Sequence, residues 1–234
     1  GGVSYSDLLG YPSNQLTNDY VFPWYNNTAM DSQLRVSNLG GTDTTINVYV
    51  GSNPTPIDTY TLAAGAATRK NYAGVNNGPL RVTSSATHIL TTIRVIFSPL
   101  SYSELLCFPV NQLTTAYSYP IYDNVAIDSQ LRVSNVGNAQ TTITVYSGNT
   151  QIDSYLLAAG AATRINYSGV NGGPLRVTSS GQPILTTIRM LYYTSAFSSF
   201  YEMTGMPDNQ LHTDYVFPWY NNTAMSSQIR FAAP

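Results

Sequence analysis

The octapeptide DSQLRVSN occupies Asp31–Asn38 and recurs unchanged at Asp128–Asn135. Leu34 and Val36 alternate with polar neighbours in it, and alternation with period two is typical of a strand with one buried face. Three further peptides recur in the same order: LAAGAATR (Leu62–Arg69 and Leu157–Arg164), GPLRVTSS (Gly78–Ser85 and Gly173–Ser180) and ILTTIR (Ile89–Arg94 and Ile184–Arg189). The chain therefore contains two copies of one strand-rich unit.

Each copy contains about seven short strand-like segments, separated by turns rich in Gly, Asn and Pro. In the first copy these segments are VFPWY, SQLRVSN, TTINVYV, IDTYTL, ATRKNYA, GPLRVTS and ILTTIRVIF. Seven short antiparallel strands in about 95 residues are typical of an immunoglobulin-like sandwich. We therefore expect an all-β protein with two tandem immunoglobulin-like antiparallel β-sandwiches and a partial third module, a β-hairpin.

The third copy begins with DYVFPWYNNTAM at Asp214–Met225, which is identical to Asp19–Met30. A lone hairpin is marginal in water, so its apolar face needs a cover. Three alternatives stay open: the hairpin packs on another subunit, the sequence is a piece of a longer repeat protein, or the hairpin folds back on the second module as a cap. The first alternative predicts an assembly interface of Tyr215, Val216, Phe217, Trp219, Tyr220, Ile229 and Phe231.

The repeat boundaries predict the organisation of the chain. We expect an N-terminal linker or strand segment at 1–18, modules at 19–99 and 116–194, linkers at 100–115 and 195–213, and the partial third module at 214–234.

Charged residues make up only 9% of the 234 residues, and the formal net charge is −2. This composition argues against nucleic acid as a partner, because nucleic-acid binding needs a basic face. A hydrophobic fraction of 43% argues against disorder, and no apolar run reaches the roughly 18 residues of a membrane span. A neutral surface rich in Ser, Thr, Asn and Tyr is typical of secreted, self-associating β proteins.

The residues that carry chemistry do not cluster in the sequence. His88 and His212 are not repeated, and the single cysteine, Cys107, excludes an intrachain disulfide. We therefore predict no catalytic residues, no metal, no cofactor and no enzymatic activity. The arginines fall on equivalent positions of the copies, either as a regular array for an anionic glycan or a subunit, or as packing and hydrogen-bonding groups on the sheets.

Three Asn-x-Ser/Thr sequons mark candidate glycosylation sites at Asn26, Asn166 and Asn221. Glycosylation at any of them would require secretion.

The series FPWYNN, SQLRVSN, GPLRVTSS and ILTTIR, followed by the linker with SELL and NQL, resembles a tandem immunoglobulin-like repeat of large secreted bacterial cell-surface proteins. The resemblance implies an extracellular structural or adhesive role without catalysis. Together with the third copy, it predicts a structural subunit of an extracellular filament or cell-surface layer that polymerises head to tail. The alternative is a cell-surface adhesin or glycan-binding module, with glycans as partners instead of other copies of the chain.

Overall fold

The computed structural model describes residues 10–86, 88–98, 101–193, 198–224 and 226–233, so the first half of the predicted segment 1–18 lies outside it. The described residues form strands and three short 3₁₀ turns, η1 (Ser13–Gln15), η2 (Val110–Gln112) and η3 (Asp208–Gln210). None of the described segments is a helix with the length and hydropathy needed to cross a bilayer. The all-β class is as expected, but the arrangement of the strands is not.

The strands of the first repeat, with residues up to Pro109, make two antiparallel sheets and a short strand pair. The five-stranded sheet has the order β11 (Phe108–Pro109), β1 (Asp19–Phe22), β8 (Leu80–Ser84), β4 (Thr44–Val50) and β5 (Asp58–Leu62). The four-stranded sheet has the order β10 (Ser101–Leu106), β9 (Ile89–Ser98), β3 (Asp31–Asn38) and β6 (Ala67–Lys70). The short pair joins β2 (Tyr25–Asn26) and β7 (Asn76–Asn77).

The second repeat has the same plan. Its five-stranded sheet has the order β16 (Thr150–Leu157), β15 (Thr141–Ser147), β19 (Leu175–Ser179), β12 (Ala116–Tyr119) and β22 (Met206–Pro207). Its four-stranded sheet has the order β17 (Ala162–Ile165), β14 (Asp128–Asn135), β20 (Ile184–Tyr193) and β21 (Ser198–Thr204). Here the short pair joins β13 (Tyr122–Asp123) and β18 (Asn171–Gly172).

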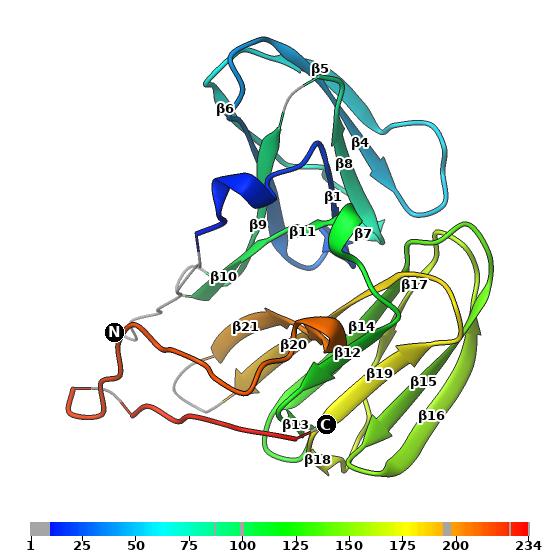
Figure 1. The fold of residues 1–234 in the computed structure, drawn as a ribbon, viewed down its shortest axis with the longest axis vertical. Coiled ribbons are helices and arrows are strands. Elements are labelled where there is room, and N and C mark those ends of the chain that lie inside the picture. The colour runs from blue at the N-terminus through cyan, green and yellow to red at the C-terminus, as the bar shows by residue number, and fades with distance from the viewer. Residues whose placement is uncertain (1–9, 87, 99–100, 194–197, 225, 234) are drawn as a thin grey trace.

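The prediction of two immunoglobulin-like sandwiches is therefore wrong. The four larger sheets are arranged as a four-bladed β-propeller of small sheets, whose strands can be followed in Figure 1. The repeats also do not fold as separate tandem modules. The range 100–115 supplies β10 and β11, which pair with β9 and β1, while Val21 of β1 is buried in the core of the second repeat. Strand periodicity shows which face is buried, but not which sheet a strand joins.

The predicted C-terminal β-hairpin is also wrong, since no described residue after η3 lies in a strand. The first repeat gives the reason. There β1 pairs with β8 and β11, whereas β3 pairs with β9 and β6. The first two long strands of a repeat thus belong to different sheets and do not pair with each other. A segment that contains only these two strands has no backbone partner within itself.

The first copy of DSQLRVSN confirms the period-two pattern, whereas the last five residues of the second copy, Leu131 to Asn135, are all buried. In β3, Leu34 and Val36 are fully buried between less buried neighbours, and both belong to the first core. Phe200 of β21 reaches the same core and stacks on Phe97, with 6.0 Å between the ring centroids. Side chains from the end of the second repeat thus complete the core of the first.

An ion pair is buried where β10 meets β21. The backbone N–H of Phe200 donates to Ser101 Oγ at 2.8 Å, and that of Glu202 donates to Ser103 Oγ at 3.3 Å. These contacts cover the Glu202 carboxylate, which pairs with Arg132, a side chain only 2% exposed. Burial raises the pKa of Glu202, and the nearby Arg132 and Arg189 oppose that shift.

The same position in the first repeat is more open to solvent. Arg35, the counterpart of Arg132, lies 3.5 Å from Glu104, and Arg94 lies 2.6 Å from the same carboxylate. Both arginine side chains are 30% exposed. One octapeptide therefore places its arginine in two different environments.

Glu202→Gln is expected to lower the free energy of unfolding by about 3–5 kcal/mol, because it leaves Arg132 charged and buried without a carboxylate. Glu104→Gln is the matched control, with an expected loss of about 1 kcal/mol or less, because its arginines reach water. Urea unfolding of both variants measures the difference. Equal losses would contradict this account of the buried pair.

Candidate assembly interface

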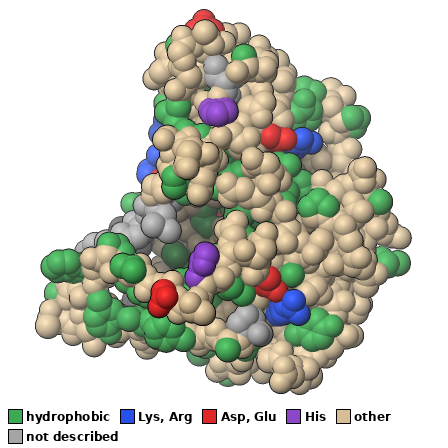
Figure 2. Space-filling model, viewed as in Figure 1, with side chains coloured by type: hydrophobic (Ala, Val, Ile, Leu, Met, Phe, Trp, Pro, Cys, Tyr) green, Lys and Arg blue, Asp and Glu red, His purple; other side chains and the backbone are tan. Residues whose placement is uncertain are grey.

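The residues predicted as an assembly interface lie on a segment, 211–233, that follows η3 and runs beside the second repeat (Figure 1). Val216 is 93% exposed, Trp219 82% and Phe231 77%. The four other predicted residues are exposed as well: Tyr215, Phe217, Tyr220 and Ile229. Figure 2 shows hydrophobic side chains gathered at the lower left, where this segment runs in Figure 1.

Six of the seven counterparts of these residues in the first repeat are buried, and Trp24 is partly buried. Tyr20, Val21 and Phe22 of β1 are each at most 1% exposed. Leu34 and Val36 of β3, which correspond to Ile229 and Phe231, are fully buried. Because the sequence of Asp214–Met225 is that of Asp19–Met30, the difference in exposure comes from missing neighbours and not from the side chains themselves.

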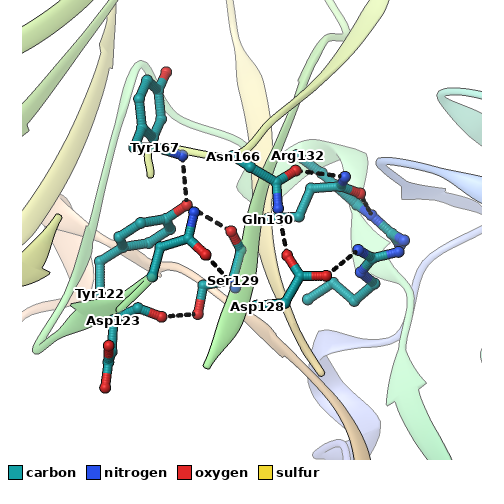
Figure 3. Close-up of polar contacts among 10 residues, drawn as sticks. Tyr122, Asp123, Asp128, Ser129, Gln130, Arg132, Asn166 and Tyr167 are labelled. Carbon is teal, nitrogen blue, oxygen red and sulfur yellow. Dashed lines mark hydrogen bonds and ion pairs between the residues drawn. The ribbon is translucent and has the colours of Figure 1, made fainter. Parts of the chain in front are cut away.

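A polar network fixes the turn between these two stretches in the complete repeats. Figure 3 shows it in the second repeat, where Tyr122 Oη donates to the carbonyl of Ser129 at 2.6 Å and accepts from the backbone N–H of Tyr167 at 3.0 Å. Burial raises the pKa of Tyr122 to about 12, which keeps its hydroxyl protonated as a donor. Asn166, a neighbour in this network, donates through Nδ2 to Asp128.

The third copy retains the local half of this network. Tyr220 Oη donates to the carbonyl of Ser227 at 3.0 Å. Asn221 Oδ1 accepts from the backbone N–H groups of Thr223 at 3.0 Å and Ala224 at 3.1 Å, as Asn26 does in the first repeat. The turn is therefore formed before the segment has strand partners, which lowers the ordering cost of binding one.

The segment lies against the second repeat with cavities between the two. One cavity of about 180 Å³ is lined by Tyr119, Pro120, Met206, Phe217 and Phe231, and a second of about 360 Å³ lies over β13, β20 and β21. Protein interiors contain few voids larger than a water molecule. The segment lies against the second repeat without a close-packed interface.

The first repeat shows how the same residues pack when they are covered. Val21 enters the core of the second repeat. The carbonyl of Pro23 accepts a hydrogen bond from Ser134 Oγ at 2.8 Å, and the guanidinium of Arg164 lies 4.3 Å from the centroid of the Trp24 ring. Sequence reasoning missed this contact between the repeats. The signal for it was that VFPW occurs in copies one and three, whereas copy two has SYPI at Ser118–Ile121.

Most arginines are packing and hydrogen-bonding groups of the kind that the second alternative described. Arg81 pairs with Asp19 at 2.5 Å, and Arg176 pairs with Asp208 at 2.8 Å. Arg69, Arg164 and Arg230 differ, because all three are exposed and no carboxylate pairs with them in the part of the chain that the structure describes.

The three sequons occupy different environments. Asn26 is buried, Asn221 is partly exposed, and Asn166 is exposed. Glycosylation at these asparagines stays a prediction, and Asn166 is the one whose side chain is most open in the folded chain.

His88 and His212 are both exposed. Among the described residues, no three His, Cys, Asp or Glu side chains lie together as a metal site would require. No protein-family model matches the sequence, and the comparison with curated proteins finds no significant similarity. The candidate interface is therefore argued from its own geometry.

Cys107 lies away from this interface, because it is buried in the first core and 1% exposed. Burial raises the pKa of its thiol to about 12, so almost no thiolate is present at pH 8. We expect no reaction with a disulfide reagent at pH 8 in the native protein, and one equivalent of reaction after unfolding in guanidinium. Absorbance of the released thiol measures both, and rapid reaction of the native protein would contradict the placement.

Proposed function

We propose that this protein is a structural subunit of an extracellular filament or cell-surface layer, and that it polymerises head to tail through the segment 214–234. The observation that carries the proposal is the opposite exposure of identical sequences. Val21 is 1% exposed and Val216 is 93% exposed, although both stand in the sequence DYVFPWYNNTAM.

The exposed side chains supply a driving force for association. Burial of a Val, Ile or Phe side chain is worth about 1.5–3 kcal/mol relative to water. The segment carries several such side chains together on a turn that is already formed. Exposed apolar patches of this kind mark interaction surfaces in folded proteins.

The shape of the contact favours an open-ended assembly. The segment repeats the stretches that form β1 and β3, and none of the described residues supplies it with strands equivalent to β8, β9 and β6 of a complete repeat. A contact between two different surfaces does not close on itself by two-fold symmetry, so it generates rings or fibres. The scarcity of charge also supports the proposal, because like-charge repulsion between copies is small.

The extracellular location belongs to the same proposal. Its support is the neutral surface, in which Ser, Thr, Asn and Tyr take the place of the usual charged groups.

Removal of 212–234 tests the function. This deletion keeps β21 and η3, which a deletion from Tyr201 onward would remove together with Glu202 and its pairing to Arg132. We expect concentration-dependent oligomers and fibres from the full chain, and monomers from the shortened one. Sedimentation velocity and negative-stain electron microscopy measure the two states.

Point variants test whether assembly needs the apolar side chains of the segment and not only its backbone. Val216→Asp is expected to prevent assembly, whereas Val125→Asp changes another exposed valine, in the second repeat, and is expected to assemble like the unaltered chain. Fibres from the shortened chain would contradict the proposal. A full chain that stays monomeric while the shortened chain binds a glycan array would favour an adhesin.

A further inference from the structure

We infer that the surface that accepts this segment is the end of the first repeat formed by Ser37, Leu39, Gly65 and Arg69, on a second copy of the chain. The inference rests on the proposed head-to-tail assembly and adds the partner surface to it. The argument compares the two complete repeats, one of which has this surface occupied.

In the second repeat the equivalent surface holds the first repeat. Ser134 donates to the carbonyl of Pro23, and Arg164 lies over the ring of Trp24. Val136 packs against the second core, which also contains Val21. Gly160 lies against Ser52 so closely that an added Cβ would come within 2.9 Å of the Ser52 Cα. Four positions of the second repeat thus form one contact surface for the first.

In the first repeat the same four positions are uncovered. Leu39, the counterpart of Val136, is 53% exposed. Ser37 is partly exposed, whereas Ser134 is fully buried. Gly65 has no atom within 4 Å of an added Cβ. Arg69 is exposed, as Arg164 is, but no aromatic ring of the described residues lies over its guanidinium. The sequence around them is shared with the second repeat, since SQLRVSN and LAAGAATR occur in both.

The group that fills this surface in the second repeat is present again, uncovered, in the third copy. Val216, Pro218 and Trp219 repeat Val21, Pro23 and Trp24, and Val216 and Trp219 are the two most exposed of the predicted interface residues. Copy two has Ser118 and Ile121 at the corresponding positions. The described residues therefore include a free donor group and a free acceptor surface of matching type.

The junction between the second and third copies follows the same rule. Pro120, the counterpart of Pro23, lines one cavity together with Ala232, which stands at the position of Ser134. The proline-containing turns of the first and second copies thus both lie near the end of the β3-like stretch of the next copy. Continuation of this rule from the third copy leads to a repeat whose acceptor surface is free, and within the described structure the first repeat has one.

The occupant is a second copy of this chain, because the donor turn repeats the sequence that fills the equivalent surface, and within its own chain it lies against the second repeat. In the docked state Trp219 would lie under Arg69, the carbonyl of Pro218 would accept from Ser37, and Val216 would cover Leu39. Each of these contacts has a counterpart between the first and second repeats.

Complementary variants test the acceptor surface. One chain carries Val216→Asp and Trp219→Ala, which removes the donor, and the other carries Leu39→Asp and Arg69→Ala, which removes the acceptor. We expect neither chain to form oligomers alone, and a 1:1 mixture to form a heterodimer and nothing larger. Sedimentation velocity with one chain fluorescently labelled resolves these species.

Matched controls guard against loss of folding. Leu156→Asp changes another exposed leucine, on β16, and is expected to leave assembly unchanged. Arg69→Ala alone removes only an exposed side chain and is expected to weaken association about two- to fivefold, the factor for one exposed cation–π contact. Unfolding midpoints of all variants should match that of the unaltered chain.

The outcomes separate the two proposals. If the donor variant is monomeric but the acceptor variant and Arg69→Ala assemble like the unaltered chain, the acceptor surface assigned here is wrong and head-to-tail assembly stands. If the unaltered chain itself stays monomeric over the concentration range, both the proposed function and this inference are overturned.

Discussion

The structure depends on one constraint, which is that the first two long strands of each repeat belong to different sheets. Backbone N–H and C=O groups of a strand need partners, and buried ones are nearly always paired. In the first repeat β1 obtains them from β8 and β11, and β3 obtains them from β9 and β6. The backbone partners of these two strands thus all come later in the chain. The third copy contains the dependent part without the strands on which it depends.

The same constraint ties the two repeats together. Because β11 closes the sheet of β1, and Phe200 completes the first core, neither repeat is finished where its repeated sequence ends. Cooperative unfolding of both repeats is the natural consequence, since loss of β21 would uncover Phe97 and the Arg132–Glu202 pair together. The repeats in the sequence therefore do not correspond to independent units of folding.

The sequence predicted local features well and the arrangement poorly, for physical reasons. Alternation in DSQLRVSN identified Leu34 and Val36 as buried, because the side-chain period of a strand is a property of the strand alone. The sequence identity between the third copy and the first also indicated that the third copy carries apolar side chains that need a cover. Sheet partners, however, depend on contacts between distant residues, so the four-bladed arrangement and the separate sheets of β1 and β3 left no local signal. The burial of Arg132 was equally hidden, because Arg35 stands in the same eight residues with a different neighbour.

The scarcity of charge has a kinetic consequence. Most of the few ionised side chains already pair within the chain, so two approaching copies exert little long-range attraction or repulsion on each other. Association between such surfaces lacks electrostatic steering. Its association rate constant is then roughly 10⁵–10⁶ M⁻¹ s⁻¹, the range for partners that are not steered by charge. Ionic strength then has little influence on how fast copies meet. Under the proposed assembly, the local concentration of the chain would govern how fast the assembly grows.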